Sequence, residues 1–400
     1  MKKLKALWKK QTKTEDPPIQ KASAAAPLMA YQSVGQPVWT PRRYDRLSEE
    51  GYKRNVIVYR AVNLIARGVA SVPWRLYADH HELVTHPLLD LLHAPNDLQA
   101  GAAFMENVAS YLLLSGNSYI EAMRLVDGRI GELYALRPDR VRVVPGRSGT
   151  PQGYEYSVNG QTVILKSTEG STNVMHLKLF HPLNDWYGMS PLEAAACAID
   201  QHNTVASHNL ALLQNGGRPS GALIVGASTP HERALSEDER HELKNTLRTF
   251  YEGEHNAGRV MVLEGDFQWK EMGLSPRDLD FIEGKKLSAR EIAQAYGVPP
   301  MLVGVPGDAT FSNYREARYH LWEDTILPLL DHIIDEFNAW LCPAFGPGLR
   351  LGYNLDAIPA LAPRREEIWS KYAGATFLTL NEKRKAMGYP PLEGGDVLES

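Results

Sequence analysis

Ser190, within a short motif that begins with glycine, is the first residue of this sequence that could carry catalytic chemistry. Residues 188–192 (GMSPL) begin like a nucleophile elbow, in which an exposed serine attacks an acyl carbon. Leu192 stands where that motif needs its last glycine, and Pro191 lacks the N–H that would serve an oxyanion hole. We therefore interpret Ser190 as a helix N-cap followed by a proline at the first helical position.

The sequence also contains no complete motif for binding phosphate or a metal ion. Alanine and leucine follow Gly221 where a phosphate-binding loop needs a lysine and a hydroxyl residue. His202 and His208 are six residues apart, about 600° of helical rotation, and so lie on different helix faces. Three other histidines are close in sequence without an HExxH-type carboxylate: His80, His81 and His86. The sequence predicts no catalytic, cofactor-binding or metal-binding residue.

The composition is that of an ordinary globular chain and limits the function classes. The formal net charge of −4 disfavours a tight nucleic-acid binder, which would cluster Lys and Arg, but leaves weak, sliding or steric contact open. Cys197 and Cys342 form no CxxC pair, so we expect a reducing compartment without a disulfide framework or zinc site. No apolar run approaches the ~20 residues that span a bilayer, so we expect no membrane partner. The length of 400 residues predicts two or three domains.

The beginning of the chain is expected to be a flexible arm. Residues 1–43 are rich in Ala, Pro, Gln and Ser after a basic start, and they lack the apolar segment of a signal peptide. A short amphipathic helix that touches a membrane or an acidic partner stays an alternative to a frayed tail.

The rest of the chain shows helix and strand patterns in separate stretches. Apolar residues at helical spacing predict one buried helix face: Val58, Val62, Ile65 and Val69. Asn-Gly and Asp-Gly pairs within residues 119–180 separate short strands and predict antiparallel sheet. Residues 236–251 predict a charged helix with a capping box, and residues 258–274 a strand-turn-strand unit. The fold class is therefore predicted to be α+β.

Residues 275–341 predict a helix, a loop and a second, longer helix. Gly297 ends the first helix, and two prolines at 299 and 300 prevent its continuation. The loop 303–311 carries no Lys or Arg, and Asp308 is its only charged residue. The longer helix contains Pro328, where we expect a kink. Its apolar spacing also fits a simple buried core helix.

Several short motifs, each weak alone, occur along the chain in a specific order: residues 55–73 (NVIVYRAVNLIARGVASVP), 86–96 (HPLLDLLHAPN), 114–120 (LSGNSYI), 188–192 (GMSPL), 292–302 (IAQAYGVPPML), 310–313 (TFSN), 325–328 (TILP) and 379–384 (TLNEKR). Together they resemble the portal proteins of tailed bacteriophages and related gene transfer agents, in the group named for phage HK97. The resemblance extends over about residues 44–396.

The resemblance implies a non-enzymatic subunit of a dodecameric ring at one capsid vertex, through which double-stranded DNA is packaged and ejected. It implies these parts: an arm, 1–43; a wing, 44–230; a stem helix, 231–255; a clip, 256–274; a second stem helix, 275–297; a tunnel-loop region, 298–311; a long kinked wing helix, 312–342; and a crown, 343–400. The implied partners are the major capsid protein, terminase and a head-tail adaptor, in a particle assembled in the bacterial cytoplasm.

The resemblance also assigns residues to the channel and the docking surface. The loop lining the channel would contain Gly304, Val305, Pro306, Gly307, Asp308, Ala309, Thr310 and Phe311. The clip residues at the docking surface would be Glu264, Gly265, Asp266, Phe267 and Trp269. Lys285 and Lys286 would face the channel as weak steering charges, or else pair with Glu283 or with a neighbouring subunit. Another ring-forming connector or scaffold without a packaging role, and a hydrolase or metal enzyme, are the alternatives.

Overall fold

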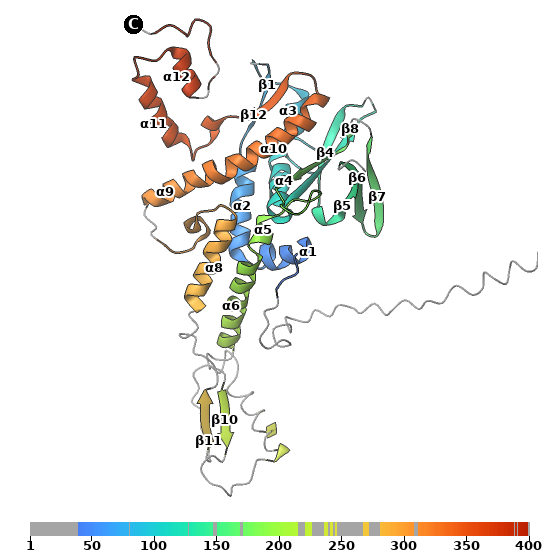
Figure 1. Cartoon of the computed structure of the whole chain (residues 1–400), viewed down its shortest axis with the longest axis vertical. Coiled ribbons are helices and arrows are strands. Elements are labelled where there is room, and N and C mark those ends of the chain that lie inside the picture. The colour runs from blue at the N-terminus through green and yellow to red at the C-terminus, as the bar shows by residue number, and fades with distance from the viewer. Residues whose placement is uncertain are drawn as a thin grey trace, which may run out of the picture. The chain divides into compact units, whose positions relative to one another are not determined.

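The computed structural model describes residues 39–79, 81–126, 128–146, 150–168, 171–214, 221–225, 236–238, 241–242, 245, 267–271, 281–307, 311–387, 389 and 391–398 (Figure 1). The chain divides into two units, Met1–Trp39 and Thr40–Ser400, and all elements below belong to the second. Thr40 donates its N–H to the Asp200 carboxylate at 2.8 Å. Folded contacts therefore begin before Tyr44, within the expected arm, most of which lies outside the described residues.

Two packed helices form the centre of the main core. α2 (Val56–Ala70) contacts α4 (Gly101–Ser115). The predicted helix face is confirmed, because its four residues are at most 1% exposed: Val58, Val62, Ile65 and Val69. The Asn55 side chain caps α2 by accepting the N–H groups of Ile57 and Val58. Shorter helical pieces accompany this pair: α1 (Tyr44–Leu47), the π-helix η2 (Ser48–Lys53) and α3 (Pro87–His93).

Antiparallel strands follow α4, as the turn signals predicted. One sheet has the order β4-β3-β9 and the other β5-β6-β7-β8. Their strands are β3 (Asn117–Arg124), β4 (Ile130–Leu136), β5 (Val141–Pro145), β6 (Pro151–Val158), β7 (Gln161–Thr168), β8 (Ser171–Thr172) and β9 (Val174–Lys178), with the 3-10 helix η3 (Pro138–Arg140) before β5. Asn159 and Gly160 have φ of 51° and 80° and form the two-residue turn between β6 and β7.

A third sheet joins strands that are distant in the sequence. β1 (Trp74–Ala78) pairs with β2 (His81–Leu83) on one side and with β12 (Leu349–Tyr353) on the other. Leu76 pairs with Leu351, and both side chains are buried. The sequence division set residues 343–400 apart as a C-terminal region, whereas β12 completes this sheet. The three antiparallel sheets and the helices confirm the predicted α+β class.

The segment around α6 and α8 contains a helix pair and a strand pair. α5 (Pro191–Ala194) leads into α6 (Ala196–Gln214), which lies beside α8 (Phe281–Ala295) (Figure 1). Between them in sequence, β10 (Gly221–Val225) pairs antiparallel with β11 (Phe267–Glu271). The predicted strand in 258–274 is confirmed as β11, but its partner among the described residues is β10 rather than a hairpin neighbour.

Most of the charged helix predicted at residues 236–251 lies outside the described residues. Positions 237, 238, 241, 242 and 245 are helical. Its capping box cannot be assigned, because residue 239 is among those outside. The beginning of the helix predicted from residue 275 likewise lies outside the described residues.

One long helical run crosses the core, with a π-helical segment inside it. It consists of α9 (Phe311–His320), η6 (Leu321–Ile326) and α10 (Leu327–Trp340). The wide turn ends just before Pro328, and the Leu327 N–H bonds to the Trp322 carbonyl, five residues back. This spacing accommodates a proline ring that would clash with the Asp324 carbonyl in a regular α-helix. The expected irregularity is thus located before Pro328. Buried Ile333 and Phe337 confirm the core-helix interpretation.

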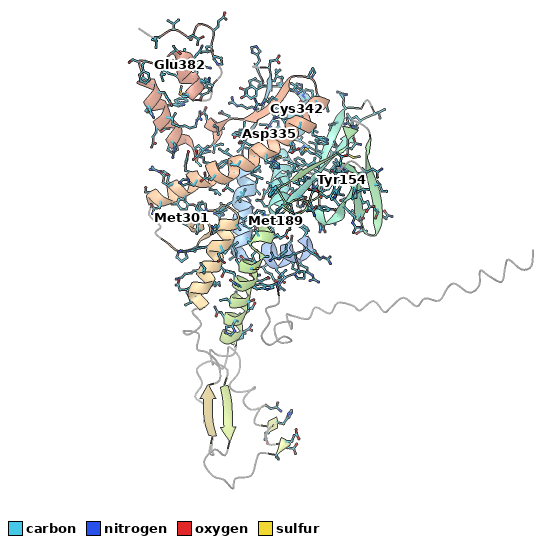
Figure 2. The ribbon with its side chains drawn as sticks, viewed as in Figure 1. Tyr154, Met189, Met301, Asp335, Cys342 and Glu382 are labelled. Carbon is cyan, nitrogen blue, oxygen red and sulfur yellow. The ribbon has the colours of Figure 1, made fainter. Side chains whose placement is uncertain are left out.

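The C-terminal part contains two short helices, α11 (Ala362–Ala373) and α12 (Leu380–Ala386), after the 3-10 helices η7 (Cys342–Ala344) and η8 (Leu355–Ala357). Thr379 and Glu382 form a capping box at the start of α12. The Arg364 guanidinium lies 4.4 Å from the ring centre of Tyr319 and so joins α11 to α9. Cys342, labelled in Figure 2, is a buried free cysteine at the start of η7. No helix in the described part of the chain is long and apolar enough to cross a bilayer.

Candidate functional site

The turn between α8 and α9 is formed by one glycine and two prolines. Gly297 has a φ of +66° and ends α8, as the sequence predicted. The Val298 N–H bonds back to the last turn of α8 at 2.9 Å. Pro299 precedes the 3-10 helix η5 (Pro300–Val303), so a regular helix cannot continue.

This turn is fastened to the π-helical segment across the fold. The Thr325 hydroxyl donates a 2.7 Å hydrogen bond to the Gly297 carbonyl. A Cβ at position 297 would lie 2.6 Å from the Thr325 oxygen. Glycine is therefore required here both by the left-handed backbone and by this close approach.

The described part of the loop is held against the core. Val305 is 6% exposed, and its N–H donates to the Pro300 carbonyl at 3.1 Å. Gly304 has a φ of +85° with open space around its Cβ position, so the backbone conformation alone favours glycine. Pro306 and Gly307 are exposed.

The remaining loop positions of the sequence prediction lie at the edge of the described structure. Asp308, Ala309 and Thr310 lie outside the described residues, and Phe311 is the first residue of α9. Val303, which we expected to begin the loop, belongs to η5 because Pro300 starts a 3-10 turn there.

A groove of about 220 Å³ brings the loop together with the two lysines that the sequence singled out. Its lining includes Lys285 and Lys286 from α8, His202 and Asn209 from α6, and Gly304, Val305 and Pro306 from the loop. The sequence placed the lysines and the loop in separate elements, and the turn after α8, which folds η5 back against α8, makes them neighbours.

The two lysines have different surroundings. Lys286 forms an ion pair with Glu283 on the same helix, which agrees with the pairing alternative. Lys285 lies beside His202, whose pKa is lowered by burial and, to a lesser extent, by the Lys285 charge. The amide nitrogen of Asn55 lies 3.2 Å from His202 Nδ1. His202 is thus a neutral, buried group that joins α6 to the cap of α2.

Two arginines that the sequence did not single out hold the loop by its backbone. Arg290 on α8 donates from Nη2 to the Pro306 carbonyl at 3.2 Å, and Arg60 on α2 donates from Nε to the Leu302 carbonyl at 3.4 Å. Arg290 lies four residues after Lys286, one helical turn further along α8. That spacing is the signal that could have placed Arg290 near the loop.

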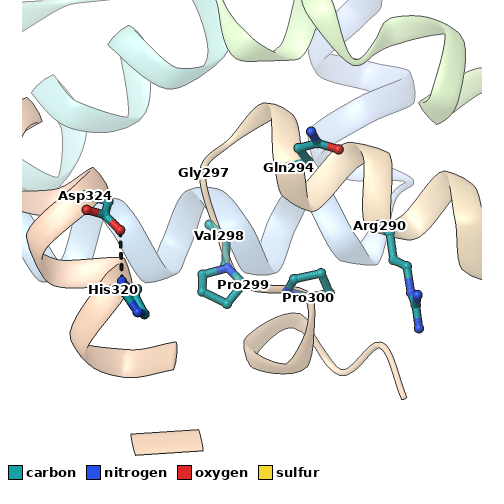
Figure 3. Close-up of a pocket in the computed structure, with 8 residues that line it drawn as sticks. All are labelled: Arg290, Gln294, Gly297, Val298, Pro299, Pro300, His320 and Asp324. Atoms are coloured by element: carbon teal, nitrogen blue, oxygen red, sulfur yellow. Dashed lines mark hydrogen bonds and ion pairs between the residues drawn. The ribbon is translucent and has the colours of Figure 1, made fainter. Parts of the chain in front are cut away.

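A second cavity, of about 370 Å³, lies beside the turn (Figure 3). Its lining consists of Arg290, Gln294, Gly297, Val298, Pro299, Pro300, His320 and Asp324. His320 Nδ1 lies 3.1 Å from an Asp324 carboxylate oxygen, one helical turn further along the long helix. Both side chains face the turn that contains Pro299 and Pro300. The cavity therefore separates the turn from the α9–η6 junction.

The docking residues expected from the sequence are only partly described. Glu264, Gly265 and Asp266 lie outside the described residues. Phe267 and Trp269 occupy alternate positions of β11, opposite residues 225 and 223 of β10.

Ser190 is a helix-capping residue in the structure, and its geometry does not support a role as a nucleophile. Its hydroxyl accepts the Glu193 N–H at 3.1 Å, which confirms the predicted N-cap. Among the residues that the structure describes, no group of three or more His, Cys, Asp and Glu side chains could hold a metal ion.

Comparison with known proteins identifies relatives over most of the chain. The family model described as phage portal protein matches residues 56–388. A protein of Rickettsia bellii without an assigned function is 42% identical over 357 residues, which are 88% of this chain and 91% of the relative. The portal protein of Enterobacteria phage HK97 is 26% identical over 351 residues, 85% of this chain and 80% of the phage protein.

A solved structure is similar over almost the whole described chain. It is a chain in the neck of a native gene transfer agent particle computed with C12 symmetry, 42% identical, with a TM-score of 0.68. The similarity covers 90% of this chain and 97% of that chain. The family match begins at the first residue of α2 and ends beyond α12, so it includes the turn, the groove and the long helix. The chain belongs to the phage portal protein family, whose members are structural proteins rather than enzymes.

Proposed function

We propose that this protein forms a ring of twelve copies at one vertex of a viral or virus-like head and conducts double-stranded DNA during packaging and ejection. The observation that carries the proposal is the 42% identity to a neck chain of a gene transfer agent particle computed with C12 symmetry, over 90% of this chain. An identity of this size over the full fold supports the same assembly as well as the same subunit.

Within this ring, we assign the stem to the helix pair α6 and α8 and the clip to the strand pair β10 and β11. The packing of α6 along α8 supports the first assignment, and the position of both strands between these helices in the sequence supports the second. The sequence had placed a stem helix at 231–255, so this assignment moves the first stem helix towards the N-terminus. Terminase and the head-tail adaptor would dock on the clip, at residues 264–267 and 269.

The constriction of the channel is assigned to Gly304–Phe311, at the end of the proposed stem. Residues 302–307 carry no charged side chain, and Asp308 is the only charge in the whole loop. Twelve basic loops would bind phosphates and hold the DNA, because each neutralised phosphate adds salt-dependent affinity. A loop without Lys or Arg lets DNA slide, and Lys285 at the groove supplies at most a weak steering charge.

The proposed wing comprises the central helices, the sheets and the long helical run, and would contact the major capsid protein. The proposed crown follows β12 and contains α11 and α12. The protein would be assembled in the bacterial cytoplasm and remain in the finished particle.

Electron microscopy of the purified full-length protein tests this proposal. We expect a twelvefold ring with an axial opening wide enough for B-form DNA. A stable monomer or dimer would overturn the proposal. A ring without such an opening, or particles that fill with DNA in its absence, would favour a connector or scaffold without a packaging role.

A further inference from the structure

Backbone hydrogen bonds tie the turn from Leu302 to Gly307 to the residues just before it, and two of its carbonyls accept from arginine side chains. The Leu302 N–H bonds to the Pro299 carbonyl at 2.9 Å, and the Val305 N–H bonds to the Pro300 carbonyl at 3.1 Å. The carbonyls of Leu302 and Pro306 instead accept from the arginines of two helices, α2 and α8. Each end of the turn thus has one brace from a helix that packs in the core.

The two braces have different surroundings. The Arg60 bond is partly buried, and Arg60 stands between Val58 and Val62, which are both fully buried in α2. The Arg290 bond is exposed to solvent, while Ala289 and Ile292 fix the adjacent positions of α8 in the core. These buried neighbours fix the backbone positions from which the two arginine side chains extend. Each guanidinium therefore reaches its carbonyl from a defined place in the fold.

The Arg290 side chain also lies close to Gly307. A Cβ at position 307 would have a single neighbour within 4 Å, the Arg290 Nη2 atom at 4.0 Å. This is an ordinary van der Waals distance, so the guanidinium reaches the end of the turn without crowding it. Figure 3 shows the Arg290 side chain leaving α8 towards the end of this turn.

We infer that Arg290, together with Arg60, is a positioning residue that holds the turn 302–307 in one conformation through its backbone carbonyls. A charged donor makes a stronger hydrogen bond to a carbonyl oxygen than a neutral donor does. This arrangement places positive charge next to the loop without placing it in the loop sequence. The last step, that the braced turn sets the constriction for DNA, rests on the proposed function.

Amide hydrogen exchange of the full-length protein tests the brace directly. In Arg290→Gln, whose shorter side chain cannot reach the Pro306 carbonyl, we expect the hydrogen-bonded Gly304 and Val305 amides to exchange about tenfold faster. The amides of residues 289–295 should stay unchanged, because a brace acts on the turn and leaves α8 intact. Arg60→Gln should accelerate exchange at Leu302–Gly304, and it provides a second variant on another helix.

Lys285→Met is the matched control, because Lys285 lies on the same helix and lines the groove beside the loop, and among the described residues it makes no bond to a loop carbonyl. We expect wild-type exchange in this variant. Equal acceleration of exchange in Lys285→Met and Arg290→Gln would show that the loss of positive charge causes the effect, and would overturn the brace. Wild-type exchange rates in both arginine variants would also overturn it. Electron microscopy of the same samples separates the two proposals. If no rings form, the DNA-conduit proposal is overturned, and the exchange rates still test the brace independently.

Discussion

The hydroxyl of Thr325 lies 2.7 Å from the carbonyl oxygen of Gly297 and joins the end of α8 to the π-helical segment of the long helix. The loop and α9 connect these two elements in sequence. The hydrogen bond between them fixes the two ends of that connection. The position of Gly297 is sensitive for this reason, because any side chain there would displace Thr325.

Replacing Gly297 by alanine should destabilise the protein more than the same change at Gly304. Both glycines have positive φ, which costs alanine about 1–2 kcal/mol. Only position 297 adds a contact of 2.6 Å to Thr325, whereas position 304 has open space. We expect about 1 kcal/mol for Gly304→Ala and about 2–3 kcal/mol for Gly297→Ala in urea unfolding. Equal losses would mean that the close approach to Thr325 is easily relieved.

Thr325→Val should lower the free energy of unfolding by about 1 kcal/mol, because valine keeps the shape and removes the donor to the Gly297 carbonyl. Thr325→Ser keeps the donor and serves as the control, with a smaller loss. The comparison is made by urea unfolding of the two variants side by side. A valine variant as stable as wild type would show that water replaces this bond at no cost.

The side-chain amide of Asn55 accepts hydrogen bonds through its oxygen and donates through its nitrogen, and an aspartate can only accept. The oxygen caps α2, while the nitrogen bonds to Asn203 at 3.0 Å and approaches His202 at 3.2 Å. Asn55→Asp should keep the cap and lose the donor, and so destabilise the protein by about 1–3 kcal/mol because position 55 is buried. Asn55→Ala should lose the further ~1 kcal/mol of the cap. Thermal unfolding distinguishes them, and identical midpoints would contradict the double role.

Local signals predicted the parts of this site that depend on neighbouring residues. The φ of Gly297 and the cap at Ser190 follow from short motifs, because a helix end is decided within a few residues. The pairing of Leu76 with Leu351 could not be predicted, since strand partners are chosen by burial between distant segments. Arg290 was missed for a related reason: its partner is a main-chain carbonyl, which carries no signature in the amino-acid sequence.

The stability of the sheet β4-β3-β9 should fall in acid through His176. Its Nε2 lies 3.0 Å from the Asn117 side-chain oxygen, and its ring stacks on Tyr119 at 4.3 Å. Burial, with a smaller contribution from the Lys178 charge, lowers the pKa of His176 from 6.5 to about 3. The folded state thus binds this proton less readily than the unfolded state. Stability is full above about pH 6.5 and is lost as the pH falls towards 3.

Urea unfolding between pH 7 and pH 4.5 measures this loss. One such histidine contributes a slope of about 1.4 kcal/mol per pH unit below its unfolded pKa. His176→Gln should remove that share of the slope, while the share from buried His202 remains. The difference between the two curves isolates His176, and parallel curves would show that its ring is protonated in the folded state.

Asp308→Lys tests the absence of basic residues from the loop. In a ring of twelve copies this change adds twelve positive charges and removes twelve negative ones at the proposed constriction. Binding of phosphates by these lysines should slow DNA passage, more strongly at low salt, because each neutralised phosphate releases a counterion. Rings should assemble as in wild type, while DNase-resistant DNA per particle falls. Asp308→Asn, which removes the negative charge and adds none, should package almost normally. Normal filling by the lysine variant at low salt would exclude Asp308 from the narrowest part of the channel.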